Sequence, residues 1–253
     1  MHNSPGTALI TGAAGGIGAA FARQLASKGY NLILVGKRVE RLVALATGLQ
    51  DHHPISAEVI GADLSNPTDV ERVEKLTAGL ESLDMLINNA GFRIPGKFSE
   101  SDVTKHLEMI HVHVITTVRL TRAALPGMIV RRRGAIINVS SFVTFLPIGG
   151  VTYRATKAYL NAFSEALQAE LRGTGVRVQA LCPGFTSNTD FYDMPEYEAF
   201  DRSQIPKALW MPAEEVVAKS LKALRRSQVV YIPGFKNRLL VALARMLTLP
   251  GRV

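Results

Sequence analysis

The stretch T-A-L-I-T-G-A-A-G-G-I-G, residues Thr7 to Gly18, decides the fold of this chain. A short apolar strand runs directly into a glycine-rich turn and then into an amphipathic segment that begins at Ile17. Backbone N–H groups at such a helix start, together with the helix dipole, form a site for a pyrophosphate. Glycine is needed there because a Cβ would block the phosphate or the close contact of helix and strand. The stretch therefore predicts a phosphate-binding turn, and a plain tight turn is the alternative.

Outward from this turn, short apolar runs alternate with amphipathic segments along nearly the whole chain. The expected strands are Thr7–Thr11, Asn31–Val35, Ala57–Gly61, Asp84–Asn88, Ala135–Val139, Arg177–Cys182 and Val229–Ile232. The expected helices are Ile17–Lys28, Val39–Leu49, Asp69–Leu80, Val103–Val130, Tyr153–Leu171 and Ala213–Leu224. Such alternation is typical of a parallel sheet covered on both faces. We therefore predict an α/β fold, in which residues 1–253 form a single doubly wound domain with a seven-stranded, mostly parallel sheet.

Composition limits what this chain can be. With 253 residues, of which 47% are hydrophobic and 20% charged, it can bury a sizeable core. No stretch approaches the ~20 apolar residues of a membrane-spanning helix, and residues 1–7 are too short and polar for a signal peptide. Cys182 is the only cysteine, which excludes an intramolecular disulfide and argues against a metal site. We expect a cytoplasmic protein that holds no metal.

The net charge of +8 is unevenly distributed along the chain. Residues 219–253 contain basic side chains and no acidic one, whereas residues 190–201 form an acidic run. Nucleic-acid binding would need interleaved aromatic residues or a helix-turn-helix pattern, and the sequence has neither. We therefore expect no nucleic-acid partner.

Two segments depart from the alternation of strands and helices. Thr186–Met211 has no clear period, and its aromatic content predicts a lid over a substrate (186–211). The basic, apolar C-terminal tail spans residues 235–253, and its part Leu239–Leu249 is apolar nearly all round, which predicts burial. The tail could cover the mouth of an active site, contact a second subunit or lie on an acidic membrane surface. Membrane contact is the least favoured of the three.

Tyr153 and Lys157 are four residues apart on an expected helix, so they share one of its faces. A free tyrosine titrates at about 10. A positive charge about 4 Å away, at an effective dielectric of about 20, contributes roughly 4 kcal/mol. That interaction could bring the phenol to a pKa near 7. The pair therefore predicts a proton donor that works near neutral pH.

Four motifs in register resemble those of the short-chain dehydrogenase/reductase family. They are T-G-x-x-x-G-x-G at Thr11–Gly18, N-N-A-G at Asn88–Gly91, a serine before Y-x-x-x-K, and P-G at Pro183–Gly184. Their order and separations match from about residue 5 to residue 232. The resemblance implies a Rossmann fold and an oxidoreductase that transfers a hydride between a nicotinamide cofactor and a ketone or secondary alcohol. A nucleotide-binding sensor or scaffold without turnover, or an epimerase or dehydratase, are the alternatives.

The same resemblance assigns roles to individual residues. Ser141 would hydrogen-bond the substrate carbonyl, and Tyr153 would deliver or take the proton as general acid/base. Lys157 would lower the pKa of Tyr153 and hold the nicotinamide ribose. Ser140 is expected to face the opposite way on the strand. The residues that the resemblance assigns to cofactor binding are Thr11, Gly12, Gly16, Ile17, Gly18, Lys37, Arg38, Asp63, Leu64, Asn89, Ala90, Gly91, Tyr153, Lys157, Pro183, Gly184 and Thr186.

The end of the second strand bears on the choice of cofactor. Families that use NAD place an acid there for the ribose 2′-OH, but this chain has Lys37 and Arg38, which suit the 2′-phosphate of NADP(H). Alternatively, both cations pair with Glu40 at the helix start. Asp63 resembles the residue that contacts the adenine amine, with a helix N-cap as the alternative.

His113 stands where many relatives carry an asparagine that supports a water chain to the lysine. An imidazole can hold such a water and could titrate near pH 6.5, so His113 is a candidate relay residue. The alternative is a core histidine without a relay role, while His111 should point elsewhere. After the sixth strand, Thr186 is the candidate for the nicotinamide carboxamide, and Thr189 is its competitor.

The substrate is predicted from the aromatic residues of the lid and of the segment after the serine. We expect an apolar pocket and a hydrophobic ketone or secondary alcohol, unless these aromatics belong to the core or to subunit contacts. The long helices Val103–Val130 and Tyr153–Leu171 form the dimer face in relatives, so a homodimer or homotetramer is expected. The aromatic and apolar residues concerned are Phe142, Phe145, Leu146, Phe191, Tyr192, Tyr197, Phe200 and Trp210.

Overall fold

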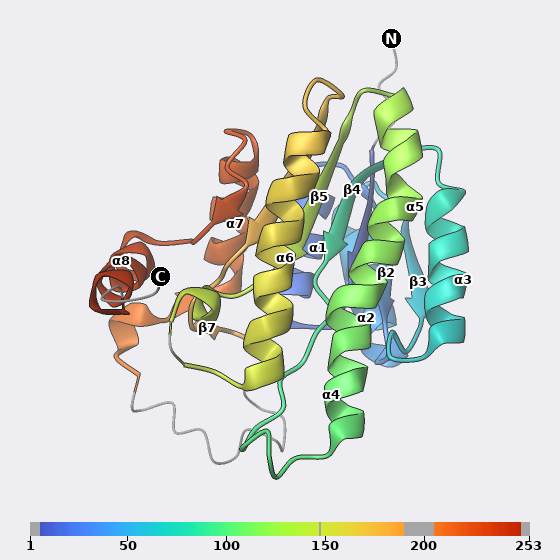
Figure 1. Cartoon of the computed structure of the whole chain (residues 1–253). Helices are drawn as coiled ribbons and strands as arrows, with labels where there is room; N and C mark the ends of the chain where they lie inside the picture. The colour runs from blue at the N-terminus through green and yellow to red at the C-terminus, as the bar shows by residue number, and fades with distance from the viewer. Residues whose placement is uncertain (1–5, 147, 190–204, 249–253) are drawn as a thin grey trace.

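The computed structural model describes residues 6–146, 148–189 and 205–248, which surround a central parallel sheet (Figure 1). The strands lie in the order β3-β2-β1-β4-β5-β6-β9, and every neighbouring pair is parallel. Their bounds are β1 Thr7–Thr11, β2 Asn31–Gly36, β3 Ala57–Gly61, β4 Leu83–Asn88, β5 Gly134–Val139, β6 Val176–Leu181 and β9 Val230–Tyr231. The predicted doubly wound α/β fold with seven strands is confirmed.

Helices cover both faces of the sheet (Figure 1). One face packs against α1 (Gly16–Ala26), α2 (Val39–His52) and α7 (Ala213–Leu224). The other face packs against α3 (Pro67–Ala78), α5 (Thr116–Val130) and α6 (Val151–Glu170). β2 shows why both faces need a cover: Leu32 and Leu34 belong to one core cluster, whereas Ile33 and Val35 belong to the other. A strand buried on both sides reads as a continuous apolar run.

The strand order reverses between β1 and β4, which lie side by side although two strands separate them in the sequence. Ligands of open α/β sheets bind beyond the carboxyl ends of the strands at such a reversal. The glycine turn follows β1, and N-N-A-G spans the end of β4. The topology therefore brings these two motifs to one edge of the sheet.

The predicted continuous helix over Val103–Val130 is wrong at its centre. α4 (Val103–Ile110) and α5 are separated by a π-helical turn, His111–Ile115. The Nδ1 atom of His111 and the hydroxyl of Thr116 both contact the carbonyl oxygen of Leu64, at 3.1 and 3.2 Å. Single π-helical turns of this kind occur inside α-helices, and the hydrophobic period alone does not reveal them.

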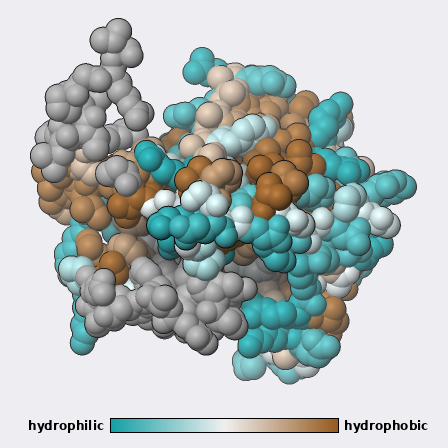
Figure 2. Space-filling model, turned by 60° about the horizontal axis from the view of Figure 1, so that its bottom comes forward, coloured by the Kyte–Doolittle hydropathy of each residue, from teal (hydrophilic) through white to brown (hydrophobic). Residues whose placement is uncertain are grey.

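Over residues 235–244, whose side chains the structure describes, the C-terminal helix α8 (Phe235–Thr248) is buried along one side, so the predicted burial of the tail is met on that side. Its buried side, with Val241, packs on the short helix η2 (Phe142–Phe145) beside the sheet. Its outer side leaves Phe235, Leu239 and Leu243 between 48% and 71% exposed. Figure 2 shows hydrophobic residues on the surface at the left edge, the side where α8 lies in Figure 1. Within the described residues, every helix is too short or too polar to span a membrane.

Candidate active site

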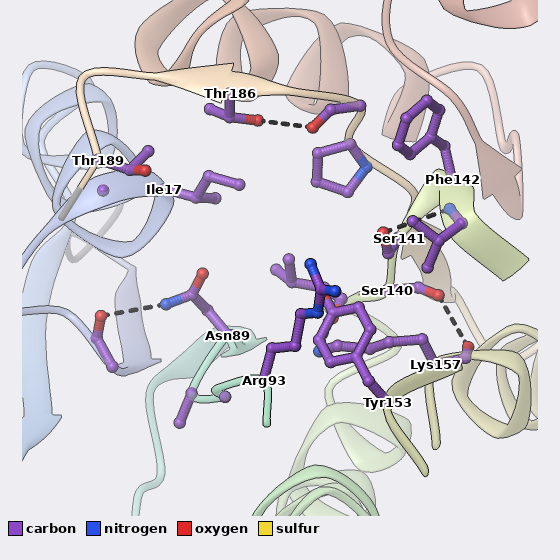
Figure 3. Close-up of a pocket in the computed structure, with 18 of the residues that line it drawn as sticks. Ile17, Asn89, Arg93, Ser140, Ser141, Phe142, Tyr153, Lys157, Thr186 and Thr189 are labelled. Carbon is purple, nitrogen blue, oxygen red and sulfur yellow. Dashed lines mark hydrogen bonds between the residues drawn. The ribbon is translucent and has the colours of Figure 1, made fainter. Parts of the chain in front are cut away.

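A cavity of about 260 Å³ opens at the carboxyl ends of the central strands (Figure 3). It joins the glycine turn, the N-N-A-G segment, the end of β5, the first turns of α6 and the P-G turn after β6. The predicted site residues that line it are Gly12, Gly16, Ile17, Arg38, Asn89, Ala90, Gly91, Ser141, Tyr153, Lys157, Pro183, Gly184 and Thr186. The predicted residues outside this lining are Thr11, Gly18, Lys37, Asp63, Leu64 and His113.

The glycine turn has the geometry that a phosphate site requires. Gly12 and Gly16 adopt left-handed φ values of 65° and 54°, which residues with a Cβ rarely adopt. A Cβ on Gly18 would lie 2.4 Å from the carbonyl oxygen of Gly12, so this glycine allows the close contact of α1 with β1. Gly15, at the N-cap of α1, provides no side-chain cap for the helix N–H groups. These free donors and the helix dipole fit a pyrophosphate.

Thr11 and Asn89 hold the two motifs together. The Thr11 hydroxyl accepts hydrogen bonds from the backbone N–H groups of Asn89 and Ala90, each at 3.0 Å. The Asn89 side-chain amide donates to the carbonyl oxygens of Thr11 and Gly12, at 2.9 and 3.1 Å. Thr11 therefore holds in place the backbone of Asn89 and Ala90, which line the cavity, although Thr11 itself does not line it.

At the end of the cavity nearest β2, Arg38 is the cation that lines the site. Lys37 instead forms an ion pair with Asp63 at 2.8 Å. Its partner is therefore Asp63 and not Glu40, the partner named in the alternative. Burial raises the pKa of Asp63, but hydrogen bonds from Lys37 and Ser65 outweigh it and leave the pKa below its ordinary value. The N-cap of α3 is Asn66, not Asp63.

Ser141, Tyr153 and Lys157 meet at the opposite end of the cavity (Figure 3). Ser141 follows β5, and its hydroxyl lies 3.4 Å from the backbone nitrogen of Val143. Lys157 reaches back from α6, and its ammonium donates to the carbonyl oxygen of Val139 at 2.8 Å. Ser140 donates its hydroxyl to the Lys157 carbonyl at 2.8 Å, so it faces α6 as expected and leaves Ser141 as the candidate catalytic serine.

The pKa values of Tyr153 and Lys157 differ from the sequence prediction. Burial lowers the pKa of Lys157 from 10.5 to about 7. Burial also raises the pKa of Tyr153 above 10.0, although a hydrogen bond with Ser141 and the charge of Arg93 oppose the increase. The expectation that Lys157 brings the phenol near pH 7 is therefore wrong for the protein alone. The lysine nitrogen lies 5.7 Å from the centre of the Tyr153 ring. Desolvation is the largest cause of the pKa shift of each group.

His113 is buried, and both of its ring nitrogens have partners within the protein. Nε2 accepts the backbone N–H of Phe92 at 3.1 Å, so Nδ1 carries the proton and donates to the Thr156 hydroxyl at 2.9 Å. Burial, and then the charge of Lys157, hold its pKa well below 6.5. This geometry favours the core histidine over the relay, and it corrects the expectation of titration near pH 6.5. His111 points elsewhere, toward Leu64, as predicted.

Past β6, both candidate threonines line the cavity. The Thr186 hydroxyl donates to the carbonyl oxygen of Gly184 at 3.1 Å. The buried hydroxyl of Thr189 has no hydrogen-bond partner among the described residues, and its side chain would lie 3.1 Å from a Cβ on Gly16. Thr189 is therefore a candidate donor toward a ligand at the glycine turn, and the choice between the two threonines stays open.

The predicted lid is described only at its two ends. β7 (Thr186–Ser187) pairs with β8 (Met211–Pro212), which ties these ends together. The Phe185 ring contacts the rings of Phe142 and Trp210, with centroids 5.3 and 5.6 Å apart. The other predicted lid aromatics, Phe191, Tyr192, Tyr197 and Phe200, lie outside the described residues.

The sequence prediction missed Arg93, which lines the cavity beside Tyr153 (Figure 3). It lies two residues after N-N-A-G, in the loop that follows β4. The rule that ligands bind at strand carboxyl ends could have identified it. It also missed the apolar wall residue Val143 and the further aromatic Phe185.

The fold and the cavity fit a nucleotide-binding protein, and comparisons with known proteins show the family. Residues 6–196 match the model of the short chain dehydrogenase family. A very-long-chain 3-oxoacyl-CoA reductase of Phaeosphaeria nodorum is 35% identical over 227 residues, which cover 87% of this chain and 63% of that protein. The chain thus spans less than two thirds of that relative's length.

Two solved structures are similar over nearly their whole length. A short-chain dehydrogenase from Sphingobium yanoikuyae in complex with NADPH has a TM-score of 0.84 at 32% identity, covering 98% of this chain and 97% of its own. A bulky-bulky ketone specific alcohol dehydrogenase from Comamonas testosteroni has a TM-score of 0.81 at 30% identity, covering 99% and 96%. The chain belongs to the short-chain dehydrogenase/reductase family. It is a nicotinamide-dependent oxidoreductase that acts on CH–OH or C=O groups.

Proposed function

We propose that this protein transfers a hydride between NADP(H) and a hydrophobic ketone or secondary alcohol, with Tyr153 as general acid/base. The observation that carries the proposal is one continuous cavity, which joins the glycine turn to Ser141, Tyr153 and Lys157. A cofactor bound at the turn would supply the hydride chemistry. The residues of this chain would bind it, position the carbonyl and move the proton.

The residues around the cavity fit a nicotinamide dinucleotide. The uncapped start of α1 suits the pyrophosphate, and Asn89 to Gly91 line the middle of the cavity. Arg38 suits a 2′-phosphate because its planar guanidinium can donate two parallel hydrogen bonds. NADP(H) is therefore the proposed cofactor in preference to NAD(H).

The proton chemistry follows from Tyr153, which is partly buried, and Lys157, which is buried. Tyr153 keeps its proton at neutral pH because burial raises the pKa of the phenol, so it can donate that proton to a carbonyl oxygen held by Ser141. The developing phenolate is an anion in a buried site, where a nearby cation stabilises it. With a pKa of about 7, Lys157 can take up a proton near neutral pH and so become that cation.

Apolar side chains line one side of the carbonyl end of the cavity. Phe142, Val143 and Phe185 line it near Ser141, and the Phe142 and Phe185 rings pack edge to face. These walls suit a substrate with an apolar body. The names of the similar proteins, a reductase of long acyl chains and an alcohol dehydrogenase specific for bulky ketones, point the same way.

The direct test of this proposal is NADPH oxidation, followed by absorbance, with a panel of apolar ketones. Turnover with several ketones is expected. Cofactor binding without turnover of any ketone or alcohol would instead favour a nucleotide sensor or scaffold. Parallel titrations with NADPH and NADH check the cofactor, and tighter binding of NADH would contradict the role of Arg38.

We also propose that the protein forms a homo-oligomer through the surface of α4 and α6. Exposed apolar side chains gather on these neighbouring helices, with Val103, Leu107 and Val151 each at least 60% exposed. Patches of this kind commonly mark protein contacts. Light scattering coupled to gel filtration would measure the mass, and a monomer at micromolar concentration would contradict the proposal.

A further inference from the structure

Arg93 is a charged residue at the carbonyl end of the cavity for which the proposed chemistry gives no role. It extends from the loop after β4, and its guanidinium lies beside the Tyr153 ring within the cavity (Figure 3). Its charge is felt at Tyr153, where it lowers the pKa of the phenol against the effect of burial. Arg93 is therefore close to the point where a substrate carbonyl would lie.

The charged side chains among the described residues that line the cavity are all basic. The basic side chains of this lining are Arg38, Arg93 and Lys157. The described lining contains no aspartate or glutamate. Arg38 lies at the end nearest β2, and the ammonium of Lys157 is bound to the carbonyl oxygen of Val139. An arginine stays charged at every physiological pH. Arg93 thus gives the carbonyl end a fixed positive charge.

The apolar walls of this end belong to other elements. Phe142 and Val143 come from η2, and Phe185 follows the P-G turn, whereas Arg93 comes from the loop after β4. In Figure 3, Phe142 and Arg93 lie on different sides of Ser141. A ligand at Ser141 would therefore meet apolar rings on one side and a guanidinium on the other.

We propose that Arg93 binds a carboxylate carried by the substrate close to its reacting carbonyl, so that the preferred substrates are oxo acids with an apolar body. The inference rests on the proposed function and names its substrate class. A guanidinium matches a carboxylate with two parallel hydrogen bonds, and such pairs are strong where water is excluded. Arg93 is then a specificity-determining residue, while Ser141 and Tyr153 act on the carbonyl.

The test compares two matched substrates, one with a free carboxylate and one in which that carboxylate is esterified. An aryl-substituted oxo acid and its methyl ester are assayed with wild-type protein, with Arg93→Gln and with Arg93→Lys. Arg154→Gln is the matched control, because Arg154 is an exposed arginine on α6 beside Tyr153 that does not line the cavity. Titration with NADPH, followed by fluorescence, verifies that each variant folds and binds cofactor.

The readout is the ratio of kcat/KM for the acid to kcat/KM for its ester. We expect this ratio to fall by about 10- to 100-fold in Arg93→Gln, the loss typical of a hydrogen bond to a charged group. It should fall less in Arg93→Lys and stay constant in Arg154→Gln, and the fall should appear mainly in KM.

Two results would overturn the inference: an unchanged ratio in Arg93→Gln, or a wild-type protein that prefers the ester. Weaker NADPH binding by Arg93→Gln, with an unchanged ratio, would assign Arg93 to the cofactor instead. Failure of the proposed function looks different, because neither the acid nor the ester would then be turned over by any variant.

Discussion

Replacing Lys157 by methionine should change how the stability of the protein depends on pH. Burial lowers the pKa of Lys157 from 10.5 to about 7, and the side chain is only 4% exposed. Between these two pH values the unfolded chain holds a proton at this position that the folded chain has released. The free energy of unfolding therefore rises with pH across this window, and the gain is lost again as pH falls toward 7.

The size of the effect follows from the displacement of the pKa. The full displacement corresponds to about 5 kcal/mol, because each pKa unit is ~1.4 kcal/mol. Between pH 7 and pH 9, roughly 2 kcal/mol of this should appear. Urea unfolding at pH 7, 8 and 9 would measure it as the difference in unfolding free energy between wild type and Lys157→Met.

Taking this difference removes the contribution of titratable groups that do not interact with Lys157. Cys182, whose pKa burial raises to about 12, does interact with it, but that thiol titrates above the range of the measurement. Lys28→Met, at an exposed lysine, is the control and should run parallel to wild type. If the unfolding free energy of Lys157→Met also changes with pH in parallel to that of the wild type, the pKa of Lys157 is not lowered in the folded protein. The account of its role beside Tyr153 would then be refuted.

Three further changes test separate parts of the site. Arg38→Asp should weaken NADPH binding by about 10- to 100-fold and leave NADH binding less affected, because it replaces a phosphate partner with a repelling charge; equal losses for both cofactors in fluorescence titrations would argue against phosphate recognition. Gly18→Ala should lower the thermal midpoint and weaken cofactor binding, since its Cβ would lie 2.4 Å from the Gly12 oxygen; a midpoint equal to wild type would show that α1 can move away. His113→Asn should keep the pH profile of kcat unchanged, because a buried, neutral imidazole has no proton to exchange near pH 6.5; a displaced acidic limb would restore the relay.

The sheet could be predicted from sequence because its strands obey a simple rule. A parallel strand buried on both faces is a continuous apolar run, and L-I-L-V between Leu32 and Val35 is such a run. The π-helical turn His111–Ile115 could not be predicted in this way. Residues at its two ends, His111 and the adjacent Thr116, contact the carbonyl oxygen of Leu64, which is distant in the sequence.

The site was predictable where it consists of motifs at strand ends, since the topology gathers those ends at one edge. The pairing of Lys37 with Asp63 needs the register of the sheet. Gly36 lies opposite Gly61, so the residues that follow these two positions emerge side by side. Arg93 belongs to no motif; its place after the end of β4 could have marked it as a candidate, but that its side chain enters the cavity depends on the fold.

The protonation states could not be predicted from spacing alone. The four-residue interval correctly places Tyr153 and Lys157 in the same cavity. The pair interaction, taken by itself, predicts a lowered pKa for the tyrosine. Desolvation acts on both groups and reverses that result, and burial is a property of the fold.

The most direct test of the central claim is the rate of NADPH oxidation by Tyr153→Phe with a ketone that the wild type reduces. General acid catalysis commonly contributes about 100- to 10,000-fold, so the account predicts a loss of that size in kcat. The affinity for NADPH, measured on the same sample, should stay within a few-fold of wild type. A Tyr153→Phe variant that binds NADPH and retains the wild-type kcat would contradict the claim that Tyr153 supplies the proton.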